Sequence, residues 1–537
     1  MQVFGLIWKL RNQKLTGKIK TEIKAKTVKI SNYFYVFMLV CLTSCQQQTK
    51  QTEQFSKPNI IIFYADDMGY GDLAIQNPQS KIPTPNLDQL AREGLLMTDA
   101  HSSSGVCTPS RYALLSGRYH WRDFNDIVHA MGESVFKENQ VTLPRILKGN
   151  GYHTAAIGKW HLGWNWEAIR KKDFTQKVKA KHGKKEIEIW PSQAYDWDKN
   201  IPDGPLSIGF DSYFGDGTIN FPPYTWIKND KVTEAPTITL QHPKEDFALE
   251  GNWELRPGPA VKGWDFYKVL PTVTSSAVNF IKNQEQAEKP FFLYVPFPSP
   301  HAPIIPNKEF KGKSEAGPYG DFVYQTDDAI GQVLDALKAI DADKNTIVIF
   351  TSDNGSERYR IKNYNHDSSH PFRGVKRDIY EGGHHVPFIV KWPNKIKPGT
   401  KNTQLFSQID ILNTLATIIN SDLPKGFQHD SYNFSDVWLT VNNKSIRENI
   451  VHNTWASKYA IRKGDWLYIN NKDGYHTRIP KWFEKGQRFK TAKDTVQLFN
   501  LKDDIGQTIN LASKFPEKVN ELASALIHEQ KAETFKN

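Results

Sequence analysis

Residues 59–67 read NIIIFYADD, a run of apolar and aromatic side chains that ends in two aspartates. Consecutive β-branched and aromatic residues predict a strand that is buried on both faces, as in a parallel sheet covered by helices. Three later runs have the same form: HTAAI at 153–157, FFLYVPF at 291–297 and NTIVIF at 345–350. Helical patterns lie between them, at residues 86–94 and 321–340. This alternation predicts an α/β sandwich.

A polar cluster follows each of the four predicted strands. The clusters are Asp66-Asp67, residues 158–161 (GKWH), residues 298–301 (PSPH) and residues 352–355 (SDNG). Binding sites of open α/β sheets gather at the carboxyl ends of the strands. We therefore expect the four clusters to meet at one edge of the sheet and to form a site there.

The pattern changes after about residue 425. Short strands are predicted at residues 450–453, 459–462, 466–470 and 497–501, followed by a helix at 516–531. These elements predict a smaller α+β C-terminal domain with an antiparallel sheet. The expected organisation is a leader at 1–44, a tether at 45–57, a catalytic domain at 58–425 and the C-terminal domain at 426–537. Residues 165–260 are rich in Trp, Pro and Gly and are expected to be long, irregular and functional.

The net charge of +11 is concentrated in the leader. Residues 1–45 contain eight Lys or Arg and one acid, whereas residues 46–537 contain 61 Lys and Arg against 57 Asp and Glu. The dense basic stretch of the body, residues 177–185, is typical of a solvated insertion. Because the body lacks a basic stripe, a nucleic-acid partner is not expected. The fifteen Trp and twenty-one Tyr suit a buried core or the stacking of sugars.

The leader has the layout of an export signal. A basic stretch precedes the apolar run YFYVFMLVCL at residues 33–42, which is short for a membrane span. The sequence LTSC at residues 42–45 resembles a bacterial lipobox, in which the cysteine becomes the lipidated first residue. We expect lipidation of Cys45 and an exported protein, anchored only by lipid at the outer membrane or cell surface, or facing the periplasm. A cleaved, unlipidated leader is the alternative.

Four side chains with oxygen donors form a candidate metal site: Asp66, Asp67, Asp353 and Asn354. Carboxylate and amide oxygens suit Ca²⁺ or Mg²⁺, and acids brought together without a cation would repel each other. The stretches that contain them, DDMGYGD and SDNG, also suit turns and helix caps. Each motif alone therefore leaves the structural alternative open.

Basic side chains near the same strand ends indicate an anionic substrate. They are Arg111, Lys159, His161, His301 and Lys376. Together with a metal ion, they could hold a tetrahedral oxyanion and stabilise charge on a group that is transferred. Taken singly, each could equally be a surface or capping residue.

Cys107 lies in the stretch GVCTPSR at residues 105–111. It has no expected disulfide partner, since Cys41 would be removed with the leader and Cys45 would be lipidated. Thr108 suits a helix cap and Pro109 the first helical position, which places Arg111 one turn after Cys107 on the same side. A helix start and an arginine both lower a thiol pKa, so Cys107 could be a thiolate nucleophile. A lone thiol in an exported protein could instead be buried or chemically converted.

The stretches CTPSR (107–111) and ALLSGR (113–118) resemble the signature of the type I, formylglycine-dependent sulfatases, which are arylsulfatase-like. Further segments resemble the same family: NIIIFYADDMGYGDL (59–73), GKWHLG (158–163), PHAP (300–303), SDNG (352–355), FRGVKRDIYEGGHHVPFIVKWP (372–393) and LFNLKDDIGQTINLA (498–512). The resemblance, to a bacterial polysaccharide sulfatase, covers residues 57–530. It implies an alkaline-phosphatase-like sandwich with a large mixed, mostly parallel sheet between helices.

The resemblance implies that Cys107 is oxidised to Cα-formylglycine, whose hydrate is the nucleophile. The partner for this step would be a formylglycine-generating or anaerobic sulfatase-maturing enzyme. One Ca²⁺ would be bound by residue 107 together with the four oxygen donors, Asp66, Asp67, Asp353 and Asn354.

The basic residues also receive roles from the resemblance. Arg111 would stabilise the hydrate. Lys159, His301 and Lys376 would bind the sulfate ester, and one of them would protonate the leaving oxygen. His161 would help to deprotonate the hemiacetal that is left after transfer.

The implied reaction is hydrolysis of sulfate esters on a sulfated saccharide. An exported lipoprotein fits degradation of an environmental polysaccharide, such as algal ulvan or galactan, or of host glycosaminoglycan. Two stretches depart from the family pattern, Lys376-Arg377-Asp378 and NHDSSHPFRG at 365–374. Arg377, His366 and His370 are therefore candidate specificity residues, or loop residues without such a role. The alternatives are a phosphonate or phosphodiester hydrolase on the same fold, and a non-catalytic glycan-binding lipoprotein.

Overall fold

The computed structural model describes residues 57–241, 250–251, 254–357, 364–440, 444–454, 458–476, 495–532 and 534–536. These residues belong to one compact unit, Lys57–Asn537. The predicted leader, Cys45 and nearly all of the tether lie outside the described residues. The predicted division between residues 425 and 426 falls inside the compact unit and stays a prediction. Within the described residues, no helix combines the length and the apolar composition needed to cross a membrane.

A ten-stranded mixed sheet forms the centre of the molecule, in the order β15-β2-β14-β13-β1-β12-β4-β7-β8-β9. Its middle strands are the four apolar runs of the sequence, and they are parallel neighbours: β13 (Thr346–Ser352), β1 (Asn59–Ala65), β12 (Phe291–Pro296) and β4 (His153–Lys159). The outer strands are β15 (Thr400–Asn402), β2 (Leu95–Met97), β14 (Phe388–Lys391), β7 (Ser212–Gly217), β8 (Ile227–Lys228) and β9 (Lys231–Val232). Because β14 is antiparallel to β13, and β8 to β7, the sheet is mixed but parallel at its centre, as expected.

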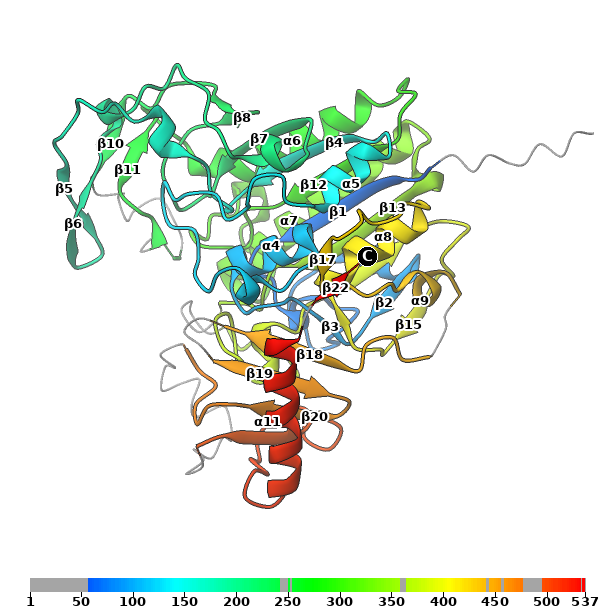
Figure 1. Ribbon diagram of the computed structural model, residues 1–537. Helices are drawn as coiled ribbons and strands as arrows, with labels where there is room; N and C mark the ends of the chain where they lie inside the picture. The colour runs from blue at the N-terminus through cyan, green and yellow to red at the C-terminus, as the bar shows by residue number, and fades with distance from the viewer. Residues whose placement is uncertain are drawn as a thin grey trace, which may run out of the picture. The chain divides into compact units, whose positions relative to one another are not determined.

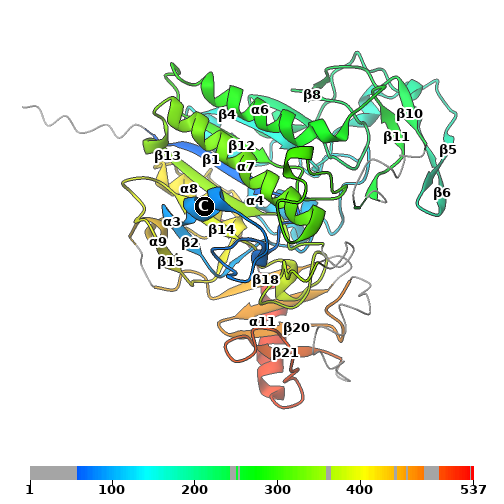
Figure 2. The same ribbon diagram turned by 180° about the vertical axis from the view of Figure 1, so that it is seen from behind.

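Helices cover both faces of this sheet, because both faces carry apolar side chains, as strand β1 shows. Ile60 and Ile62 contribute to one hydrophobic core. Ile61 and Phe63 contribute to the other, and all four side chains are fully buried. The first core is closed by α4 (Cys107–Ser116), α5 (Leu143–Gly149), α8 (Ile411–Ile418) and α9 (Ser435–Thr440) (Figure 1). The second is closed by α3 (Pro85–Arg92), α6 (Val269–Lys282) and α7 (Gly317–Ala339), so the two predicted helices are confirmed as α3 and α7 (Figure 2).

A smaller antiparallel sheet occupies the C-terminal part, as expected. Its strands are β18 (Asn449–Asn453), β19 (Tyr459–Lys463), β20 (Trp466–Ile469) and β21 (Gln497–Asn500), and α11 (Pro516–Lys531) lies against them (Figure 1). One face shares a core with Leu522 of α11 and with Ala113 of α4. The opposite face shares a core with Ile379 and Tyr380. The small sheet therefore packs directly against the helix that begins at Cys107.

Residues 165–260 contain more regular structure than the sequence indicated. Besides β7 to β9, they hold a hairpin of β5 (Val178–His182) and β6 (Lys185–Ile189), and β10 (Ile238–Leu240) pairs with β11 (Gly258–Ala260). The lysines of residues 177–185 suggested a solvated insertion from the sequence. In β5 they are exposed and alternate with half-buried Val178 and buried Ala180. This is the period-two pattern of a strand, so the expectation of an irregular segment was wrong for this stretch.

Truncation of Phe63 should test the central packing. Its ring is fully buried and stacks on Phe297 with centroids 6.0 Å apart. Phe63→Ala should lower the free energy of unfolding by about 3–5 kcal/mol, because it leaves a cavity between sheet and helices. Urea unfolding followed by circular dichroism would measure this. The control Ile527→Ala removes a 51% exposed side chain and should change stability by about 0.5 kcal/mol or less; equal losses in both variants would contradict the packing described.

Candidate active site

The four polar clusters meet at one edge of the central sheet, as expected. Asp66 and Asp67 follow β1, and Asp353 follows β13. Lys159 is the last residue of β4, and His301 lies in the loop after β12. The carboxyl ends of these four adjacent parallel strands converge, so side chains far apart in the sequence share one buried space.

Asp66, Asp67, Asp353 and Asn354 form a buried cluster of oxygen donors. One ligand atom each from Asp66, Asp353 and Cys107 lies within 4.8 Å of the other two. Oδ1 of Asp66 and Oδ1 of Asn354 are buried and accept no hydrogen bond. Buried oxygens without a partner are uncommon, and carboxylate and amide oxygens are the ligands that Ca²⁺ prefers. The residues present therefore fit a calcium ion.

Each carboxylate of the cluster also contacts a buried cation. The pairs are Arg111 Nη2 with Asp353 Oδ2 at 2.7 Å, Lys159 Nζ with Asp66 Oδ2 at 2.5 Å, and Lys376 Nζ with Asp67 Oδ1 at 2.7 Å. Three negative and three positive groups are thus held away from water in one place. Buried charges are tolerated only when they remain paired, so each member of this set depends on the others.

Burial is the largest influence on the pKa of all three carboxyl groups. At Asp66, it is outweighed by Lys159 and Arg111, which lower the pKa. At Asp67, burial raises the pKa to about 7, and it also raises the pKa of Asp353. A divalent cation among the three acids would favour their charged forms.

Helix α4 begins at Cys107 itself, with Val106 as the N-cap. Thr108, expected as the cap, instead donates its hydroxyl hydrogen bond to the carbonyl of His161 at 2.9 Å. Arg111 follows one turn later, as expected, and its guanidinium donates to Asp353 of the oxygen cluster. Burial raises the pKa of the Cys107 thiol, although nearby lysines oppose the shift. These surroundings disfavour the thiolate that the sequence left open.

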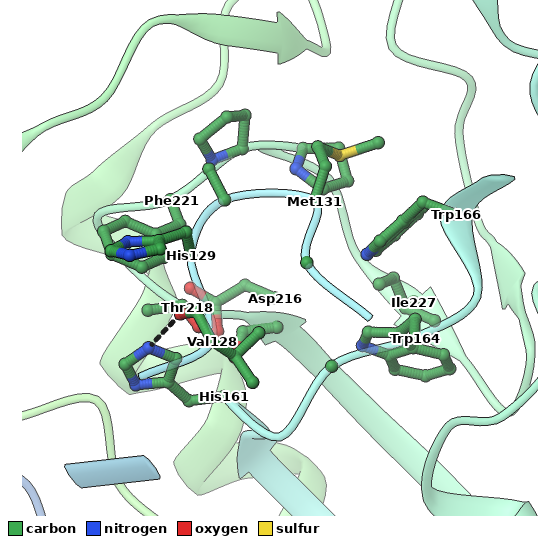
Figure 3. Close-up of a pocket in the computed structure, with 16 residues that line it drawn as sticks. Val128, His129, Met131, His161, Trp164, Trp166, Asp216, Thr218, Phe221 and Ile227 are labelled. Atoms are coloured by element: carbon green, nitrogen blue, oxygen red, sulfur yellow. Dashed lines mark hydrogen bonds between the residues drawn. The ribbon is translucent and has the colours of Figure 1, made fainter. Parts of the chain in front are cut away.

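Two histidines, His161 and His301, share the surroundings of Cys107, and these surroundings disfavour the charged form of both rings. Burial, followed by neighbouring cations, lowers the pKa of both His161 and His301 well below the usual value. Nε2 of His161 lies 2.9 Å from the carbonyl oxygen of Val128, to which it donates (Figure 3). Its buried Nδ1 has no hydrogen-bond partner and is therefore an unused acceptor. Nε2 of His301 lies 3.8 Å from Asp67.

The backbone is strained at three site residues. Asp67, His161 and Arg377 have φ angles of 67°, 53° and 76°. Residues other than glycine adopt positive φ at a cost, and such positions cluster at functional sites. The surrounding packing must hold these residues in place.

A bulge in strand β4 directs Lys159 into the site. The register shifts between Ile157 and Lys159, and Gly158 between them has φ 130°. A Cβ atom at Gly158 would lie 2.1 Å from the backbone oxygen of Pro296. Only glycine fits here, so this residue sets the direction of the lysine that follows.

A cavity of about 370 Å³ borders Cys107. His161, His301 and Lys376 also line it, so four candidate catalytic residues face one space. The other lining residues are Val106, Ile127, Asn220, Phe221, Glu254, Arg256, Glu357, Arg377 and His476. Apart from Arg377, none of these was predicted to line a site: Val106 lies beside the predicted Cys107, and most of the others come from segments without a motif or a periodic pattern.

The three candidate specificity residues have different surroundings. Arg377 lines the cavity and forms an ion pair with Glu357. His366 and His370 are not among its lining residues. Nε2 of His366 lies 2.8 Å from Asp72 Oδ1, behind the loop that carries Asp66 and Asp67. His366 therefore supports that loop rather than facing the cavity.

Comparisons with known proteins agree over nearly the whole chain. A family model described as sulfatase matches residues 58–421, and one described as the C-terminal part of N-sulphoglucosamine sulphohydrolase matches residues 374–532. An N-acetylgalactosamine-6-O-sulfatase of Bacteroides thetaiotaomicron is 32% identical over 528 residues, which cover 91% of this chain and 96% of the relative. Human N-acetylgalactosamine-6-sulfatase is 31% identical over 504 residues, 88% of this chain and 86% of the relative.

Solved structures of sulfatases also resemble this chain over most of its length. A Bacteroides thetaiotaomicron protein labelled 6S-sulf, solved in work on the metabolism of multiple glycosaminoglycans, superposes with a TM-score of 0.73. It is 32% identical, and the match covers 89% of this chain and 100% of that protein. A sulfatase from a Pseudoalteromonas species superposes with a TM-score of 0.66 at 23% identity, covering 91% and 93%, and shows the shared fold alone.

Gly158→Ala should disrupt the bulge. The new Cβ would collide with the Pro296 carbonyl and hold a positive φ, which together should cost about 1–3 kcal/mol of stability. Thermal unfolding would measure the loss. The control Gly149→Ala lies in α5, where no atom is within 4 Å of the new Cβ, and should leave stability unchanged or raise it. A Gly158→Ala protein as stable as the control would show that the bulge does not constrain β4.

Proposed function

The chain belongs to the sulfatase family, and from this membership we propose that it removes 6-O-sulfate from N-acetylgalactosamine in a sulfated glycan. That the protein is a sulfuric ester hydrolase follows from the family and from relatives that match it along most of their length. The 32% identity to an N-acetylgalactosamine-6-O-sulfatase, over 96% of that protein, carries the choice of sugar. Algal galactan or ulvan, the source favoured by the leader and the aromatic content, remains the competing substrate.

Cys107 is the proposed precursor of the nucleophile. It lies at the first residue of α4, borders the cavity and has surroundings that disfavour a thiolate. Cα-formylglycine at this position would supply a hydrated aldehyde as the oxygen nucleophile for attack on the ester sulfur. A formylglycine-generating or anaerobic sulfatase-maturing enzyme is the proposed partner, supported by the CTPSR motif.

The oxygen cluster is the proposed site for one Ca²⁺. Asp66, Asp67, Asp353 and Asn354 would hold it, with residue 107 beside them. The ion would supply positive charge that orients and polarises a sulfate oxygen. An ion here would also neutralise the carboxylates that Lys159 and Lys376 now pair with.

The basic residues would then bind the substrate. Released from Asp67, the ammonium group of Lys376 would have the charge and the position to bind a sulfate oxygen, because Lys376 lines the cavity. Lys159 is not among the lining residues and would have to move from Asp66 towards the cavity to do the same.

His301 lines the cavity, and its Nδ1 donates to the carbonyl oxygen of Ala302 at 2.5 Å. Nε2 of the neutral ring is then an acceptor, so only the protonated ring could donate a hydrogen bond to the ester oxygen. His161 has an unused acceptor, Nδ1, with which to take a proton from the group at residue 107. Arg111 stabilises negative charge beside the helix start.

Export and lipid anchoring through Cys45 also remain proposals, supported by the leader sequence alone. Labelling cells with an alkyne-tagged fatty acid tests them: wild-type protein should incorporate the label, and Cys45→Ala should not. The control Cys41→Ala should be labelled like wild type, and label in Cys45→Ala would contradict the anchor.

Loss of Cys107 should abolish turnover. Cys107→Ala should reduce hydrolysis of N-acetylgalactosamine 6-sulfate by roughly 10⁴-fold or more, because the nucleophile is removed. Sulfate release measured by ion chromatography would show this, with mass spectrometry of the peptide that contains residue 107 to confirm conversion in the wild type. Full activity of Cys107→Ala would contradict the mechanism. Faster turnover of an aryl phosphodiester or of galactan oligosaccharides would contradict the proposed substrate.

Calcium should stabilise the protein through the oxygen cluster. Added Ca²⁺ should raise the unfolding temperature of chelator-treated wild type, since a ligand that binds only the folded state stabilises it. Asp353→Asn should weaken Ca²⁺ binding by about tenfold or more, because it removes a charged ligand. Asp335→Asn, whose side chain is 79% exposed, should respond like wild type. Identical calcium responses in Asp353→Asn and wild type would argue against this site.

A further inference from the structure

Three histidines outside the proposed catalytic residues meet in the interior. His101 lies in β3 (Ala100–His101), His384 follows the turn Glu381–Gly383, and His452 lies in β18. All three side chains are fully buried. One ring nitrogen of each lies within 4.8 Å of the other two. The cluster thus joins the strand before α4 to the C-terminal sheet.

Hydrogen bonds fix which nitrogens of the first two rings carry protons. Nε2 of His384 lies 3.1 Å from the carbonyl oxygen of Ile379, so this nitrogen is the donor. Nε2 of His101 lies 2.9 Å from Asp99 Oδ1 and donates to that carboxylate. In neutral rings, the Nδ1 atoms are then both acceptors. These two Nδ1 atoms face each other at 3.2 Å, a repulsive arrangement unless a positive ion lies near both.

His452 gives an independent reason to expect a ligand. Both of its ring nitrogens are buried and lack a hydrogen-bond partner. Its ring stacks on that of His384, with centroids 3.6 Å apart and 15° between the planes. A buried imidazole with no polar partner is unfavourable, and a metal ion would satisfy it if the ring swings out of the stack.

The surroundings accept positive charge. Asp99 and Glu381 are carboxylates beside the rings, and Glu381 is fully buried. The guanidinium of Arg462 is the positive group beside them, with Nη1 2.6 Å from Asp99 Oδ1, so two carboxylates face one fixed positive charge. Asp99 behind His101 also resembles the carboxylate–histidine arrangement that orients metal-binding imidazoles.

We propose that His101, His384 and His452 bind a divalent transition metal ion, Zn²⁺ in the first instance. Neutral imidazole is a preferred ligand for such ions, whereas Ca²⁺ requires oxygen donors. This second metal site is separate from the oxygen cluster. It would tie β3, which leads into Cys107, to β18 of the small sheet.

Zinc titration of the full chain, kept saturated with Ca²⁺ after removal of transition metals, tests the proposal. The wild type should bind one Zn²⁺ per chain, and zinc-edge X-ray absorption should show imidazole nitrogen neighbours. His452→Gln should bind Zn²⁺ at least roughly tenfold more weakly, because one ligand is lost. The control His120→Gln changes another buried histidine, which contacts Asn453, and should bind Zn²⁺ like wild type.

Three results would overturn the proposal. Failure of the wild type to bind Zn²⁺ would mean that a shared proton, not a metal, lies between the rings of His101 and His384. Zinc with oxygen or sulfur neighbours would place the ion at the oxygen cluster or at Cys107. Unchanged affinity in His452→Gln would exclude this cluster. The absorption spectrum of wild type decides the question even if the variant does not fold.

Discussion

The structure depends on the pairing of three acidic and three basic side chains at the end of the central sheet, out of contact with water. Asp66, Asp67 and Asp353 could not be buried together without compensation, because like charges at this distance repel strongly. In the described structure, compensation comes from one arginine and two lysines. The ends of β1, β4 and β13, the bulge in β4 and the start of α4 bring five of these groups together, and Lys376 reaches them from the segment between β13 and β14.

The same pairing explains why the site would need a metal ion before its lysines could bind an anionic substrate. A carboxylate neutralised by a lysine leaves that lysine unable to attract another anion. A divalent cation placed among the acids would take over the neutralising role and free Lys159 and Lys376, of which Lys376 lines the cavity. In this account a bound metal ion would have two effects: it would polarise the substrate, and it would release the basic residues that bind the substrate.

Much of this could be predicted from the sequence, because each prediction rested on a local pattern. The run that contains Ile60 to Tyr64 has the pattern of a strand with two buried faces, which places Asp66 at its carboxyl end. The CTPSR motif located the start of α4 within two residues: the predicted cap was Thr108, and the observed cap is Val106. The cavity wall was not predictable. Arg256, Glu254 and His476 reach it from loops whose positions depend on long-range packing, and β5–β6 was missed because its lysines masked a period-two pattern.

A crystal structure of the protein grown with saturating Ca²⁺ is the most direct test of the electrostatic account. The account predicts an ion bound by Asp66, Asp67, Asp353 and Asn354, with the ammonium groups of Lys159 and Lys376 moved away from the carboxylates and towards the cavity. An oxygen cluster without calcium, with Lys159 still paired to Asp66 and Lys376 to Asp67, would contradict it.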